Sequence, residues 1–172
     1  LKIKYPGASI VAAVNQEKPS ANAPQPKLKV LKQYLKDLSF ENVNAPDSLR
    51  PSAEEPEVSI QVHVSADQIN PNQYEVLLKI AASANSKAGA LFRADVDYAG
   101  VFELLNIPEA DLHAVIMIEC PRLLFPYARQ IVSESVRGGG FPPLMLEPID
   151  FVALYRERLD EVKRAQETEA AE

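Results

Sequence analysis

The side chains that could supply a nucleophile and a general base are one cysteine, Cys120, and two histidines, His63 and His113. A cysteine hydrolase needs a base held beside its thiol. His63 lies on the polar side of an alternating segment, and His113 shares an apolar segment with Cys120. The favoured interpretation of Cys120 is a small buried packing residue, and a thiol enzyme using Cys120 and His113 is the weaker alternative.

Metal and phosphate sites are not predicted either. One cysteine and two separated histidines match no metal-ligand spacing. The run Gly138-Gly139-Gly140 follows no strand pattern and carries no lysine, so it indicates a flexible connector rather than a phosphate-binding loop. We expect no catalysis, no metal and no cofactor.

Acidic side chains show a pattern that could serve binding. Asp37 and Glu41 are four positions apart in a strand-like segment and therefore point to the same side, as do Asp95 and Asp97. If the two strands are neighbours, the four carboxylates share one surface that suits a basic partner. The residues alone favour the plainer alternative, an ordinary solvated sheet face.

Composition limits the classes of partner. The 172 residues are 47% apolar, carry a formal net charge of −6 and include one cysteine. Nucleic-acid binding is not expected, because it requires clustered Lys and Arg. An intrachain disulfide is impossible, which favours the cytosol. No run approaches the roughly 20 apolar residues of a membrane helix, so we expect no membrane insertion.

Three segments differ in composition. Residues 1–26 end in a stretch rich in Pro, Asn, Gln and Ala, which predicts a flexible N-terminal tail. Residues 27–162 are expected to form one folded domain. Residues 163–172 are charged and Ala-rich, and we expect them to form a flexible acidic C-terminal tail.

The folded segment begins with strand patterns. Strict alternation in residues 57–65 and 74–82, with turn-forming residues between them, predicts an antiparallel hairpin with a longish loop. Residues 34–42 and 90–98 alternate in the same way. Four strands with one apolar face each predict a single antiparallel sheet with one side that needs cover.

Helix patterns follow the strands. Residues 109–136 predict a long apolar helix with kinks at Pro121 and Pro126, and a second, amphipathic helix begins with Asp150 as its N-cap. The fold class is therefore α+β, with helices packed on one face of the sheet. The apolar surface of two such helices exceeds what one small sheet can cover, which favours an oligomer.

Four strings are specific enough to indicate a family. They are DLSFENVNAP at 37–46, CPRLLFPYAR at 120–129, GGFPPLMLEPIDF at 139–151 and ALY at 153–155. In order and spacing they resemble the SecB export chaperones over residues 31–159, about three quarters of the chain. Residues 1–26 lie outside this resemblance.

The resemblance implies a fold and a function. SecB subunits form a four-stranded antiparallel sheet with helices on one face and assemble as a homotetramer, a dimer of dimers. They hold unfolded precursor proteins in long apolar grooves and pass them to the SecA translocation ATPase. The groove positions implied in this chain are Phe40, Phe92, Val101, Phe102, Phe151, Leu154 and Tyr155.

In the family, the small basic tail of SecA docks on the acidic outer surface of the sheet. The resemblance assigns this role to Asp37, Glu41 and Asp95. Arg93 and Ala94 depart from the family pattern, which is more apolar and less basic there. The departure at Arg93 is expected to weaken or alter docking of the SecA tail. An alternative keeps the fold but dedicates the chaperone to one unstable client, such as an antitoxin.

Overall fold

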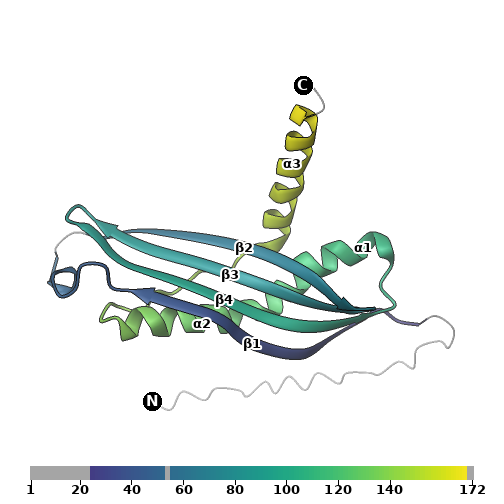
Figure 1. Ribbon diagram of the computed structural model, residues 1–172, viewed down its shortest axis with the longest axis horizontal. Helices are drawn as coiled ribbons and strands as arrows, with labels where there is room; N and C mark the ends of the chain where they lie inside the picture. The colour runs from purple at the N-terminus through teal and green to yellow at the C-terminus, as the bar shows by residue number, and fades with distance from the viewer. Residues whose placement is uncertain (1–23, 53–54, 170–172) are drawn as a thin grey trace, which may run out of the picture.

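The computed structural model describes residues 24–52 and 55–169, and its main body is a sheet backed by helices (Figure 1). The strands are β1 (Lys27–Glu41), β2 (Glu57–Asn70), β3 (Gln73–Ser86) and β4 (Gly89–Leu105), with a 3-10 turn, η1 (Asp47–Leu49), after β1. The helical segments are α1 (Glu109–Ala114), η2 (Val115–Glu119), α2 (Cys120–Gly138) and α3 (Phe151–Glu169). None of the helices in the described ranges is both long and apolar enough to cross a membrane.

The four strands form one antiparallel sheet in the order β1-β4-β3-β2, which confirms the predicted sheet. Each strand is longer than the sequence pattern predicted. The hairpin between β2 and β3 also differs from the prediction, because its loop has only two residues, Pro71 and Asn72. Asn72 adopts φ 66°, a left-handed conformation that asparagine tolerates and that a tight hairpin turn requires.

The helices cover one face of the sheet, as predicted, and the core lies between the two layers. Alternation along β3 and β4 directs fully buried side chains such as Leu78, Ile80 and Val96 toward α2 residues such as Leu124 and Val132. The helix α2 packs mainly on these two central strands. The same face of the two edge strands, β1 and β2, is therefore only partly covered.

One nearly continuous helical segment runs from α1 to α2, and its interruption lies at the first predicted kink. The five residues before Cys120 form the π-helical turn η2. Pro121 explains this widening, because its ring lacks an N–H and clashes with the carbonyl one turn earlier. Pro126 lies inside α2.

The last helix, α3, begins as predicted. Asp150 Oδ1 accepts hydrogen bonds of 3.0 Å from the backbone N–H groups of Val152 and Ala153, and Phe151 is buried in the core. From this anchor α3 points away from the sheet (Figure 1). It remains helical to Glu169, although a flexible tail was expected from residue 163, because Glu, Lys, Arg, Gln and Ala are good helix formers. Most of the expected N-terminal tail lies outside the described residues.

Candidate functional site

The outer face of the sheet, which no helix covers, brings the predicted acidic residues together. β1 and β4 are neighbours, so the condition for a shared carboxylate surface is met. Register pairs Glu41 with Arg93, Ser39 with Asp95, and Asp37 with Asp97. The three residues predicted for docking, Asp37, Glu41 and Asp95, therefore lie on one face within two adjacent strands.

Ion pairs divide the carboxylates of this face into two groups. Asp97 is paired with Lys79 at 3.2 Å, and Glu75 is paired with Lys36 at 3.0 Å. Glu75 also accepts a hydrogen bond from the Tyr34 hydroxyl, and these contacts lower the pKa of its carboxyl group. Within the described ranges, by contrast, no ion pair or hydrogen bond includes the side chains of Asp37, Glu41 or Asp95.

Aromatic rings gather on the opposite, helix-bearing face at the end of the sheet where β1 finishes. The rings of Phe40 and Phe92 stack with centroids 5.9 Å apart, and Phe141 lies 5.1 Å from Phe92. The Phe40 ring fits against Gly139, where a Cβ atom would lie only 2.2 Å from it. The amide of Asn42 fixes the same loop by donating to the Gly139 carbonyl at 3.0 Å.

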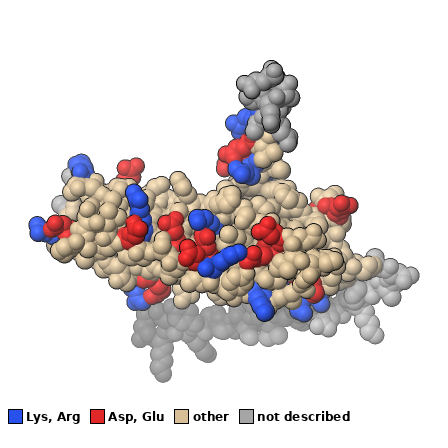
Figure 2. All heavy atoms as spheres, viewed as in Figure 1, with Lys and Arg blue, Asp and Glu red and all other residues tan. Residues whose placement is uncertain are grey.

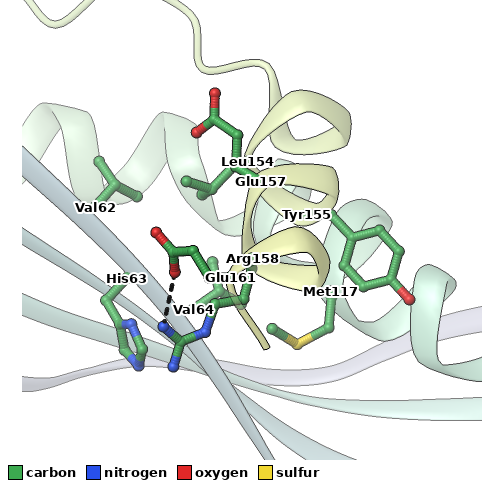
Figure 3. A pocket seen from close by; sticks show the side chains of 9 residues that line it. All are labelled: Val62, His63, Val64, Met117, Leu154, Tyr155, Glu157, Arg158 and Glu161. Carbon is green, nitrogen blue, oxygen red and sulfur yellow. Dashed lines mark hydrogen bonds and ion pairs between the residues drawn. The ribbon is translucent and has the colours of Figure 1, made fainter. Parts of the chain in front are cut away.

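An apolar strip on this face follows the edge strand β2. Val58, Ile60 and Val62 alternate toward the helix-bearing side, and Val58 and Ile60 remain 41% and 44% exposed because α2 does not reach them. The strip leads to a cleft of about 190 Å³ between β2, η2 and α3 (Figure 3). Its lining residues are Val62, His63, Val64, Met117, Leu154, Tyr155, Glu157, Arg158 and Glu161.

The predicted groove residues fall into separate places. Phe40 and Phe92 form the aromatic cluster, and Leu154 and Tyr155 line the cleft at α3. Phe151 is buried beside Phe125, with ring centroids 6.1 Å apart, and anchors α3.

Two predicted groove positions do not join the others. Phe102 is fully buried in the core. Val101 pairs with Lys32 and Glu75 and lies on the outer face of the sheet, because adjacent strand residues point to opposite sides.

Sequence reasoning missed several residues that shape these surfaces. Val58 and Ile60 lie on the apolar side of the alternating segment 57–65, but a sequence pattern does not show that β2 is an edge strand left half open. Phe141, which lies in the aromatic cluster, is not among the predicted groove positions. His113, considered earlier as a base, instead approaches the Tyr155 hydroxyl through Nδ1 at 2.8 Å and links α1 to α3.

The environment of Cys120 does not suit nucleophilic chemistry. The residue is fully buried, and burial together with the nearby Glu119 raises the pKa of its thiol to about 12. A thiol with this pKa is almost entirely protonated at neutral pH, whereas the thiolate is the nucleophile. No cluster of His, Cys, Asp and Glu able to hold a metal ion occurs in the part of the chain that the structure describes.

The Cys120 thiol should therefore resist modification in the folded protein. We expect less than a tenth of the reactivity of a free cysteine toward a thiol reagent at pH 8, and full reactivity in denaturant, because burial and the raised pKa both suppress the thiolate. Colorimetric thiol titration measures both states. Cys120→Ser should remain folded, and full reactivity of the thiol in the native wild-type protein would contradict the packing role.

Comparison with known proteins agrees with these features. A family model described as preprotein translocase subunit SecB matches residues 21–162. A protein-export protein SecB of Rhodopseudomonas palustris (strain TIE-1) is 54% identical over 149 residues, covering 87% of this chain and 92% of that protein. The SecB of Beijerinckia indica subsp. indica is 56% identical over 137 residues, covering 80% of this chain and 86% of that protein.

A solved structure supports the fold. The SecB-like chaperone Rv1957 of Mycobacterium tuberculosis, in complex with a peptide from the HigA1 antitoxin, superposes with a TM-score of 0.60 at 19% identity, covering 71% of this chain and 90% of that one. At that identity the likeness concerns the fold alone. The two curated relatives are each more than half identical over at least 80% of the chain. Together with the family model, they show that the protein belongs to the SecB family of protein-export chaperones.

Proposed function

We propose that this protein is a cytoplasmic holdase without catalytic activity, which binds unfolded precursor proteins in apolar grooves and delivers them to the SecA motor. The observation that carries the proposal is the half-open apolar strip of β2. Val58 and Ile60 are both more than 40% exposed on the helix-bearing side of the sheet, where the corresponding residues of the central strands are buried. Such a surface can cover side chains of a non-native chain without reading a fixed sequence.

The client groove that we propose joins this strip to its neighbours. Val58 pairs with Ala84, which in turn pairs with Phe92 of the aromatic cluster, so the strip and the cluster share one face. In the other direction the strip reaches the cleft lined by Leu154 and Tyr155. An extended polypeptide suits this geometry because alternate side chains would meet the strip.

Docking of SecA is proposed for the opposite face. Asp37, Glu41 and Asp95 carry no ion pair within the described ranges and so are available to lysines and arginines of a partner. Client and motor would then occupy different sides of one sheet. Because this division leaves the acidic face free while the groove is filled, the loaded chaperone can still be recognised.

Assembly as a homotetramer, a dimer of dimers, is part of the proposal. On the helix-bearing side of β1, Leu35 and Leu38 are exposed, and Leu123 and Tyr127 are exposed on α2. Large apolar side chains of this kind at a sheet edge and on a helix favour burial between subunits.

A second candidate function keeps the groove but narrows the client. The structural neighbour from Mycobacterium tuberculosis holds an antitoxin peptide, which makes dedication to one unstable client worth testing. Broad capture of unrelated unfolded proteins, together with affinity for the SecA tail, would favour export over that alternative.

Native mass measurement with and without a denatured precursor tests the proposal directly. We expect a tetramer that takes up the unfolded precursor, and a delay in aggregation of several unrelated denatured proteins. A closed monomer that delays the aggregation of none of them would overturn the holdase assignment. Addition of the SecA tail peptide to the loaded complex should give a ternary species.

A further inference from the structure

Among the described residues, the acidic face contains a cation, Arg93, that has no ion-pair partner. Arg93 lies on β4, opposite Glu41 on β1 and two positions from Asp95 on its own strand. No ion pair or hydrogen bond in residues 24–52 and 55–169 includes the Arg93 side chain. Lys36 and Lys79 on the same face are both paired with carboxylates, so Arg93 differs from them.

The surface around Arg93 is hollowed and polar. A shallow depression of about 350 Å³ is lined by Arg93, Asp95 and neighbouring residues of β2 and β3, among them the outward-facing Ser59 and Ser83. Ser59, Ser83 and Arg93 form one row across three strands. Serine hydroxyls can donate hydrogen bonds, and a guanidinium can hold a carboxylate through two parallel hydrogen bonds, so this row suits an anion.

The charge pattern therefore differs from a uniformly acidic field. Figure 2 shows acidic and basic side chains interspersed along the molecule. A partner with only positive charges would place one of them near Arg93, where like charges repel. Within residues 24–52 and 55–169, no carboxylate forms an ion pair with Arg93 that would offset its charge. A basic partner that carries one carboxylate would place that carboxylate at Arg93 and its lysines at the carboxylates of the face.

We propose that Arg93 is a specificity-determining residue of the docking face, which selects a basic partner segment carrying a carboxylate two positions from a lysine. The spacing follows from the strand, because Asp95 and Arg93 point to the same side about 7 Å apart and an extended partner repeats that interval. This inference rests on the proposed docking function and specifies the chemistry of the partner.

Two synthetic peptides that alternate serine with lysine, differing only in a central glutamate or glutamine, provide the test. The glutamate peptide has the lower net charge, so a uniformly acidic face would bind it more weakly. We expect wild-type protein to prefer the glutamate peptide about threefold, the ratio expected of an exposed ion pair. Arg93→Gln should reverse the preference. Titration calorimetry at low and moderate salt measures each affinity.

Lys79→Gln is the matched control, since it removes a cation from the same face but a cation that is already paired with Asp97. It should strengthen binding of both peptides and leave their ratio unchanged. A preference of both wild type and Arg93→Gln for the glutamine peptide would overturn the inference while acidic docking stands. If neither peptide binds wild-type protein at low salt, the docking function is overturned as well.

Discussion

Val58→Asp/Ile60→Asp should lower the affinity for an unfolded client by about 10- to 100-fold. Both side chains are more than 40% exposed, and this exposed apolar surface is what a client can cover. Covering it contributes about 1 to 1.5 kcal/mol for each residue, and an aspartate there would also have to lose its hydration. Fluorescence anisotropy with a labelled, denatured precursor measures the affinity.

Ile69→Asp is the control for this prediction. Ile69 lies near the β2–β3 hairpin and is 50% exposed, so the substitution makes one such apolar-to-aspartate change away from the strip. Its client affinity should match that of wild-type protein. Native mass spectra of all variants report whether assembly is retained. Equal losses in the double variant and in Ile69→Asp would mean that client binding is not localised to the strip.

The periodicity of the strands was the most reliable guide to the fold. Alternation assigned the buried side of β3 and β4 correctly, and it located Asp37 and Asp95 on the other side. Strand ends were missed because hydrogen bonding to a neighbour extends a strand through residues with weak patterns. The hairpin loop was predicted too long for the same reason, since β2 and β3 pair as far as Asn70 and Gln73.

The candidate groove was harder to predict because exposure depends on strand order. Ile60 and Ile80 look alike in the sequence, yet Ile80 is buried on a central strand and Ile60 is half open on an edge strand. No local pattern encodes that difference. Val101 was also hard to place. Its family position groups it with Phe102, whereas strand alternation puts the two side chains on opposite faces of the sheet.

The two faces of the sheet also differ in how salt would affect the dissociation of their proposed partners. Apolar contacts along β2 depend on buried area and respond weakly to salt, whereas contacts with free carboxylates are screened within about 10 Å at moderate ionic strength. In the proposed arrangement, a motor that binds through charge would therefore dissociate without disturbing the client. Substitutions on the outer face should separate the two activities.

Asp37→Lys/Glu41→Lys should accordingly weaken binding of the SecA tail by about 10- to 100-fold and leave client affinity unchanged. Neither carboxylate has an ion pair within the described ranges, so both are free to contact a basic partner, and each reversal replaces an attraction by a repulsion. Stability should change little, because Asp37→Lys removes a like-charge pair with Asp97 whereas Glu41→Lys creates one with Arg93, and the two effects oppose each other. Titration calorimetry measures tail binding, and thermal melting measures stability.

Asp67→Lys provides the comparison for one charge reversal, because it exchanges a single carboxylate for a lysine on the outward side of β2, where Asp67 pairs with Glu75 rather than with the docking carboxylates. It should reduce tail affinity less than threefold, through the general change in charge alone. The large effect of the double reversal should shrink at high salt, since exposed charges are screened. Parallel losses of tail and client binding in a correctly assembled double variant would contradict the assignment of the two activities to opposite faces of the sheet.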